Sequence, residues 1–366
     1  MLQYIGPVLV SSGYACAARN NIAALIKSAN VDLTVLPVAF ENKRSSFGSI
    51  GKLIESYSNR KIKYKINLIH LTPENWPKFI QKDKYNIGYT VWETDKLPKS
   101  WVGLINQVQE VWVPSQWNKE VFISSGVTIP IRVVPHTLDI TIKDKEYDTS
   151  FIKNDEFKFY SIFQWTERKN PLGLLTAYLT EFTANDNVTL ILKTYHMNWE
   201  LNQQQIIKDH VKNLKEKLKL STYPKINFIG NLLSNNDIYA IHQVGDCLVL
   251  PHRGEGFGIP LAEGMLFGNP VITTGWGGNM EFTKPNNSYL IKHTMINVAN
   301  MPWDKYSPDQ QWAEPSIPDL RRLMRHVYDH KEEAKEVALV GQNEIMTNLN
   351  YDTIGNLMKE LLNNVK

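Results

Sequence analysis

Cysteine is scarce in this sequence of 366 residues, and a strong charge imbalance and long apolar runs are missing altogether. The two cysteines, Cys16 and Cys247, lie in opposite halves of the chain, which excludes a disulfide framework and a Cys-x-x-Cys metal site. No stretch approaches the roughly 18 consecutive apolar residues that a membrane-spanning helix needs. The 40 Lys and Arg almost balance the 37 Asp and Glu, so the charge gives no argument for a dedicated nucleic-acid binder.

The sequence also lacks signals for export and for a bound metal. The N-terminal stretch MLQYIGPVLVSSG has no basic region and only a short apolar run, so we expect no signal peptide and a cytoplasmic protein. The histidines, among them His70, His196 and His242, show no spacing typical of metal ligands. His252 lies beside a glycine-rich loop and is the one histidine that we would test.

What the sequence does contain is a regular alternation of short apolar runs and amphipathic stretches. This alternation predicts an α/β protein with a mostly parallel sheet that is covered on both faces. In the first part of the chain we expect strands at 31–40, 62–71, 85–92, 110–115 and 131–136, and helices at 14–30, 49–59 and 98–109. In the second part we expect strands at 157–165, 187–195, 225–230, 246–251, 270–274 and 288–291. The helices expected there are 170–183, 203–220, 235–244, 258–268, 317–330, 331–349 and 352–364.

The alternation is interrupted by a polar segment that begins at residue 138. We interpret residues 141–156 as a linker between two Rossmann-like domains, at 1–140 and 157–345. Residues 346–366 are expected to form a C-terminal helix, and its return toward the first domain is left open. Two such domains in succession predict a cleft between them, with ligands beyond the carboxyl ends of the strands.

Glycine is concentrated in the segment 254–278, which holds eight of the 20 glycines of the chain. A predicted buried strand runs into the loop 252–258, and Pro260 suits the first turn of the helix that follows. Gly268 is a good residue to end that helix. Glycines let a backbone approach a ligand closely, and the N–H groups of a helix start attract anions. The pattern is typical of a phosphate site, but packing turns use glycine in the same way.

Two carboxylates lie in this region, Glu255 in the loop and Glu263 eight residues later in the predicted helix. Burying a carboxylate is costly unless it accepts hydrogen bonds, and sugar or ribose hydroxyls would supply them. The alternative is that Glu263 complements the helix dipole and that Glu255 is solvated. The chemistry of the residues alone does not decide between the two interpretations.

The segment GEGFGIPLAEGMLFGNPVITTGWGGNMEF resembles the signature region of the family 4 retaining glycosyltransferases, which carry the motif E-x7-E. Further similar segments are spread over most of the chain and are found at 12–15, 88–127, 131–139, 163–178 and 226–238. The combination is specific, whereas each segment alone is not. The resemblance implies a GT-B fold, in which two Rossmann-like βαβ domains face each other across a cleft. It also implies that the first domain binds the acceptor and the second binds the nucleotide sugar.

The resemblance implies roles for particular residues. Glu255 would hold the hydroxyls of the donor sugar near the reacting carbon, and Glu263 would accept hydrogen bonds from the ribose. Arg168 and Lys169 match the basic pair that neutralises the diphosphate as charge develops on the leaving oxygen. A cation pair that opens a helix opposes the helix dipole, which favours an anionic partner over a solvated pair. The other donor-side positions are the backbone amides around Phe257, Gly258 and Ile259, then Leu232 near the base, and Gly13 in the N-terminal glycine loop.

The sequence departs from the family pattern at two places. Gln164 occupies about the position at which most family members have a basic residue. The positive charge in this region is therefore confined to the pair Arg168 and Lys169. Many members carry a histidine that faces the donor sugar, where this sequence has Trp92 and Glu93, and the group that takes the acceptor proton is left open. Tyr14, Trp92 and Glu93 are our candidates on the acceptor side. We interpret His136 as a structural hydrogen-bonding residue.

The leading hypothesis is therefore a retaining hexosyltransferase that moves a sugar from a nucleoside diphosphate to an acceptor hydroxyl, by attack on the face of the leaving group. The sequence contains no Asp-x-Asp, with which glycosyltransferases of the other common fold hold a divalent metal, so we expect a metal-independent reaction without a cofactor. The alternatives are a nucleotide-sugar epimerase and a non-catalytic nucleotide-sugar-binding protein. An NAD-dependent oxidoreductase is disfavoured, because the glycine spacing is not that of G-x-G-x-x-G.

The acceptor is not identified by the sequence, and a carbohydrate, a lipid-linked glycan or a protein would each supply a hydroxyl. The donor base, the sugar, the linkage and the oligomeric state are equally unspecified. The basic run at 60–65 alternates with apolar residues, which is typical of a strand with one solvated face. Weak contact with anionic lipid at the inner face of a membrane is the alternative interpretation of this run.

Overall fold

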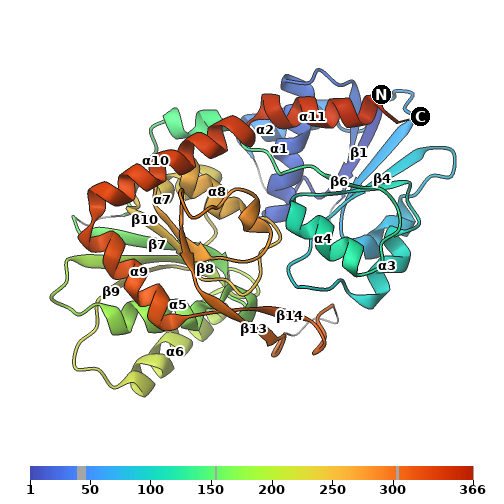
Figure 1. Cartoon of the computed structure of the whole chain (residues 1–366). Coiled ribbons are helices and arrows are strands. Elements are labelled where there is room, and N and C mark those ends of the chain that lie inside the picture. Colours follow the sequence, from blue (N-terminus) through green and yellow to red (C-terminus); the bar gives the residue numbers. More distant parts are fainter. Residues whose placement is uncertain (39–46, 153–154, 302–304, 366) are drawn as a thin grey trace. The chain divides into compact units, whose positions relative to one another are not determined.

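The computed structural model describes residues 1–38, 47–152, 155–301 and 305–365. These residues form two compact units, one made of Met1–Ile140 with Met346–Lys366 and the other of Thr141–Ile345. Each unit contains a six-stranded parallel sheet with helices between its strands (Figure 1). The prediction of an α/β protein with two Rossmann-like parts is thereby confirmed.

The sheet of the first unit has the strand order β2-β1-β3-β4-β5-β6. Its strands are β1 (Leu2–Gly6), β2 (Leu33–Pro37), β3 (Ile66–His70), β4 (Tyr85–Tyr89), β5 (Glu110–Val113) and β6 (Ile131–Val133). Its helices are α1 (Gly13–Lys27), α2 (Gly48–Tyr57), α3 (Lys99–Ile105), α4 (Gln116–Ser124) and α11 (Tyr351–Asn363), with a 3-10 turn η1 (Pro73–Lys78). The last helix, drawn in red, runs beside α1, and both contribute to one hydrophobic core (Figure 1). The end of the chain therefore stabilises the first unit.

Besides the turn η1, one strand and one α-helix of this unit have no counterpart among the predicted elements. Strand β1 lies between β2 and β3, with Leu2 and Tyr4 buried, but its apolar run is too short to be assigned from the sequence. Helix α4 begins after Ser115, whose hydroxyl accepts a hydrogen bond from the backbone N–H of Asn118. That N-cap is the sequence signal that could have located the helix.

A cluster of buried rings lies near the carboxyl ends of β3 and β4. His70 stacks on Tyr89 with ring centroids 4.3 Å apart, and its Nδ1 lies 2.6 Å from the hydroxyl of Tyr4. Nδ1 of His136 lies 3.0 Å from the hydroxyl of Tyr89. His136 is 5% exposed, and the other three are fully buried. His136 is thus a hydrogen-bonding residue of the core, as the sequence predicted.

These histidines should make the fold sensitive to acid. Burial lowers the pKa of His136 to about 3 and lowers the pKa of His70 well below its usual value, so both rings are neutral in the folded chain. The unfolded chain binds protons at these rings below about pH 6.5. The free energy of unfolding is therefore highest above about pH 6.5 and falls as the pH is lowered. The loss is about 2 kcal/mol at about pH 5 for a ring such as His136. Urea unfolding at both pH values measures the loss. His136→Gln should shrink the difference between them, and an unchanged difference would contradict this account.

The sheet of the second unit has the strand order β12-β11-β10-β7-β8-β9. Its strands are β7 (Phe157–Gln164), β8 (Val188–Tyr195), β9 (Lys225–Ile229), β10 (Cys247–Leu250), β11 (Val271–Thr274) and β12 (Tyr289–Ile291). Its helices are α5 (Pro171–Glu181), α6 (Leu201–Leu218), α7 (Asn235–Val244), α8 (Ile259–Leu266), α9 (Ile317–Asp329) and α10 (Lys331–Asn348), whose end belongs to the first unit. An antiparallel hairpin of β13 (His293–Asn297) and β14 (Gln311–Pro315) was not predicted. Short 3-10 turns are η2 (Ile140–Asp144), η3 (Glu167–Lys169) and η4 (Gly278–Glu281).

Some predicted segments lie partly outside the described residues. These are the last two residues of the strand expected at 31–40, residues 153 and 154 of the expected linker, and residue 366. The described residues of the expected linker are grouped with the second unit. No helix within the described ranges combines the length and the hydropathy of a membrane span.

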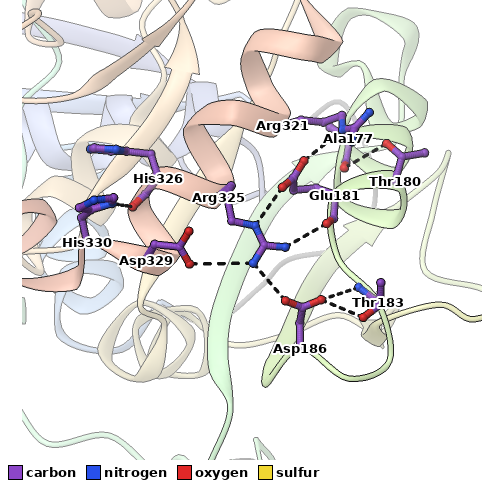
Figure 2. Close-up of polar contacts among 10 residues, drawn as sticks. All are labelled: Ala177, Thr180, Glu181, Thr183, Asp186, Arg321, Arg325, His326, Asp329 and His330. Atoms are coloured by element: carbon purple, nitrogen blue, oxygen red, sulfur yellow. Dashed lines mark hydrogen bonds and ion pairs between the residues drawn. The ribbon is translucent and has the colours of Figure 1, made fainter.

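An ion-pair network joins α9 to the end of α5 (Figure 2). Arg325 on α9 donates to the carboxylate of Glu181 at 2.9 Å and to that of Asp186 at 3.0 Å. Arg321 donates to the other oxygen of Glu181 at 3.1 Å. Connected pairs of this kind contribute more than isolated surface pairs. The network holds the C-terminal end of α5, the helix that starts just after the predicted basic pair.

Candidate functional site

Three loops of the second unit come together at the carboxyl ends of the neighbouring strands β7, β10 and β11. β7 leads into η3, β10 into the loop 251–258, and β11 into the turn before η4. The backbone N–H of Arg253 donates to the carbonyl of Arg168 at 2.7 Å, and that of Gly278 donates to the carbonyl of Glu255 at 2.6 Å. Because adjacent parallel strands end at the same edge of the sheet, segments far apart in sequence meet here.

Glu255 lies between the two predicted cations. Its carboxylate forms an ion pair with Lys169 and lies 3.7 Å from Nη1 of Arg168, which also donates to the carbonyl of Gly254 at 2.6 Å. Burial raises the pKa of Glu255, but the charges of Lys169 and Arg168 outweigh this effect and bring the pKa down to about 2. The carboxylate is therefore ionised at neutral pH and is 5% exposed. The alternative of a solvated Glu255 is wrong.

The basic pair does not lie in a helix start. Arg168 and Lys169 belong to η3, and α5 begins after Asn170, which adopts the left-handed conformation with φ of 52°. The side chain of Asn170 accepts a hydrogen bond from the backbone N–H of Gly173 and caps the helix. In the structure, the carboxylate of Glu255 pairs with both cations.

The glycine-rich loop rests on a Gly-Gly turn. A Cβ added at Gly278 would lie 1.9 Å from the carbonyl oxygen of Gly256, which is far inside van der Waals contact. Gly277 has φ of 102°, a conformation that side chains disfavour. Both positions therefore require glycine, so that the loop around Glu255 and the turn can pack backbone to backbone.

Helix α8 starts at the end of this loop. Gly258 is its N-cap and has φ of 93°, and Pro260 occupies its first turn as predicted. Gly268 follows the helix with φ of 75°, which confirms its predicted place as terminator. Phe257 is buried against Phe282, and Ile259 is 9% exposed. The first N–H groups of any α-helix have no partner within the helix, so this start suits an anion.

Glu263 lies on α8 beyond its first turn, which does not support the helix-dipole interpretation. It is 7% exposed, and its Oε2 lies 3.6 Å from Nε2 of His242 on α7. Leu232, in the loop between β9 and α7, is 49% exposed. The backbone carbonyl of Asn231, next to it, accepts a hydrogen bond from Lys193 at 2.7 Å. Burial lowers the pKa of Lys193 to about 8.

The acceptor-side candidates lie together in the first unit. Gly13 begins α1, and the hydroxyl of the next residue, Tyr14, lies 2.7 Å from Oγ1 of Thr90 after β4. Trp92 is 2% exposed, so its ring offers little surface to an acceptor, and Glu93 beside it is half-buried. A part for Tyr14, Trp92 and Glu93 in acceptor binding, and for Gly13 on the donor side, stays a prediction.

Arg253, which supports the glycine-rich loop around Glu255, was not predicted from the sequence. Its guanidinium donates to the carboxylates of Glu314 at 2.5 Å and Glu167 at 2.9 Å. Glu314 lies on the unpredicted hairpin, so the sequence carried no signal for this contact. His252 is fully buried, and burial lowers its pKa to about 3. No three His, Cys, Asp or Glu side chains of the described chain gather as metal ligands, and metal independence stays a prediction.

Residues 143–300, less than half of the chain, match the family model described as glycosyl transferases group 1. A protein of Sulfolobus islandicus filamentous virus (isolate Iceland/Hveragerdi), named putative glycosyltransferase 45, is 25% identical over 222 residues, or 59% of this chain. The match spans 56% of that relative, a little over half of its length. These two similarities support a glycosyltransferase.

Several solved structures resemble the whole chain. HepE of Anabaena in complex with UDP-glucose has a TM-score of 0.72 at 16% identity, covering 100% of this chain and 99% of that one. Sucrose-phosphate synthase from Thermosynechococcus elongatus has a TM-score of 0.70 at 15% identity, covering 99% and 98%. A glycosyltransferase from Rickettsia africae ESF-5 has a TM-score of 0.66 at 16% identity, covering 100% and 99%. Likeness at these identities concerns the fold alone, and the predicted GT-B fold is confirmed.

Proposed function

We propose that this chain is a retaining glycosyltransferase of family 4, which transfers a hexose-type sugar from a nucleoside diphosphate to an acceptor hydroxyl. The observation that carries the proposal is the convergence of Arg168, Lys169 and Glu255 beside the start of α8. The family match, which covers most of the second unit, and the GT-B fold support it.

In this proposal the two cations and the helix start bind the diphosphate. Charge rises on the leaving oxygen as the glycosidic bond breaks, so fixed positive groups stabilise the transition state more than the ground state. Lys169 contacts both the diphosphate and Glu255, and the ionised carboxylate of Glu255 accepts hydrogen bonds from the sugar near the reacting carbon. Glu263 accepts from the ribose hydroxyls. The acceptor attacks on the face of the leaving group, which keeps the anomeric configuration.

The proposed partners are a nucleotide-sugar donor and an acceptor that carries a hydroxyl. HepE is described in complex with UDP-glucose, which makes this compound the first donor to test. The acceptor would bind to the first unit, and a carbohydrate, a lipid-linked glycan or a protein remains to be distinguished. We also propose that the reaction needs no metal and takes place in the cytoplasm.

Thermal unfolding with a panel of nucleoside diphosphates and their sugars tests the donor. A bound donor at about a hundred times its Kd should stabilise the fold by about 2.7 kcal/mol, with or without a chelator. Product analysis by NMR should then show an unchanged anomeric configuration on the acceptor. An inverted product would overturn the retaining mechanism, and conversion of the donor without any acceptor would favour an epimerase. Stabilisation by none of the sugar nucleotides would overturn the proposal as a whole.

A further inference from the structure

A chain of four polar side chains runs from Glu263 into the core of the second unit. It consists of Glu263 on α8, His242 on α7, Tyr160 on β7 and Asn269 after α8, and each of them is buried. Buried polar groups are costly unless they hydrogen bond, so the donors and acceptors along this chain are closely constrained.

The first constraint is the orientation of Asn269. Its Nδ2 donates to the backbone carbonyl oxygen of His242 at 2.7 Å, and because a carbonyl oxygen only accepts, this contact fixes which end of the amide points there. The same Nδ2 donates to the hydroxyl of Tyr160 at 2.8 Å. The hydroxyl therefore accepts from Asn269 and has its own hydrogen left to donate.

The second constraint is the tautomer of His242. Among the described residues, the other side-chain hydrogen-bond partner of the Tyr160 hydroxyl is Nδ1 of His242, 3.0 Å away. Burial raises the pKa of Tyr160 well above its usual value, so the hydroxyl keeps its hydrogen and donates it to Nδ1. A neutral imidazole with an accepting Nδ1 carries its proton on Nε2. The ring also stacks on Phe267 with centroids 5.5 Å apart, which restricts its rotation.

The Nε2–H group then faces a carboxylate. Nε2 of His242 lies 3.6 Å from Oε2 of Glu263 and has no hydrogen-bond partner within the part of the chain that the structure describes. A shift of a few tenths of an ångström would bring the two atoms to hydrogen-bond distance. The opposite tautomer would turn a lone pair toward the carboxylate instead.

We propose that His242 is a positioning residue for Glu263: its Nε2–H holds Oε2 and leaves Oε1 to accept from the ribose hydroxyls of the donor. Tyr160 and Asn269 act through His242, because they select the tautomer that donates. The inference rests on the proposed function, in which Glu263 contacts the ribose, and it adds three residues to the donor site.

Two substitutions at His242 separate positioning from packing. The amide nitrogen of glutamine takes about the place of Nε2 and can donate to Glu263, whereas leucine fills the space without a donor. We expect His242→Leu to raise the KM for the nucleotide sugar about tenfold, the value of one hydrogen bond, with a smaller change in kcat. His242→Gln should restore most of the affinity. His330→Leu, at an exposed histidine of the same unit, is the matched control and should change neither constant.

Nitrogen-15 NMR of the His242 ring tests the tautomer without any donor. The free wild-type protein should show the proton on Nε2, and Tyr160→Phe should weaken that preference. A proton on Nδ1 in the wild-type protein would overturn the inference, and so would equal rises in KM for the glutamine and leucine variants. Failure of the proposed function is distinguishable, because the wild-type protein itself would then neither bind nor turn over a sugar nucleotide.

Discussion

Replacing Glu255 with glutamine is expected to lower kcat for sugar transfer by at least about a hundredfold, while binding of the nucleoside diphosphate is kept or tightened. Glutamine has nearly the same shape, so the loop keeps its geometry, but the charge of a carboxylate with a pKa of about 2 is lost. Lys169 and Arg168 then lose the negative charge of this carboxylate and attract the diphosphate more strongly. Initial rates and calorimetry with the nucleoside diphosphate measure the two effects separately.

Lys169→Met should have the opposite effect on diphosphate binding. It removes a cation, so the nucleoside diphosphate should bind more weakly. Glu216→Gln, at an exposed carboxylate on α6, is the matched control and should leave both measurements unchanged. A Glu255→Gln protein with wild-type turnover would refute the role of this residue. The folded pKa of Glu255 lies below its usual value of 4.5, so its stabilising effect is present above about pH 4.5 and is lost as the pH falls toward 2.

Gly278→Ala should disable the loop that carries Glu255 through the backbone alone. The new Cβ would collide with the carbonyl of Gly256, so the loop that carries Glu255 must move away from the turn. A displacement of about 1 Å at a reacting centre can cost about a hundredfold in rate, and overpacking typically costs about 1–3 kcal/mol of stability. Steady-state kinetics and urea unfolding measure the two losses.

Gly103→Ala is the control for this substitution. Gly103 lies in helix α3, where an added Cβ would meet no atom within 4 Å, so alanine should be neutral or slightly stabilising. If Gly278→Ala keeps the wild-type KM, kcat and unfolding midpoint, neither activity nor stability depends on the close packing of the loop on the Gly-Gly turn.

The order of strands and helices was largely predictable, because local patterns produce it. The predicted helix at 235–244 has the observed bounds of α7, and the predicted strand at 187–195 differs from β8 by one residue. Elements were not predicted where their local sequence signal was short or weak. β1 has five residues with little contrast to their surroundings, and the hairpin of β13 and β14 has an exposed strand with a weak apolar pattern.

The candidate site was predictable only in part. The resemblance pointed to Glu255 and to the basic pair at 168–169 as separate features, one in a loop and one at a helix start. The structure shows an ion pair across 86 residues of sequence, which exists because β10 lies beside β7 in the sheet. His242 had no motif to mark it, since its partners Tyr160, Glu263 and Asn269 come from other elements.

The sequence by itself determined the α/β class, the order and approximate bounds of most elements, and the residue types of the glycine-rich loop. These follow from periodicity, turn residues and glycine content, which act over a few neighbouring residues. Only the tertiary structure decided which charges meet, how far the pKa of Glu255 falls, and which side chains face the two ring nitrogens of His242. Those properties depend on burial and on the partners that the strand order brings within a few ångströms, and no local pattern contains either.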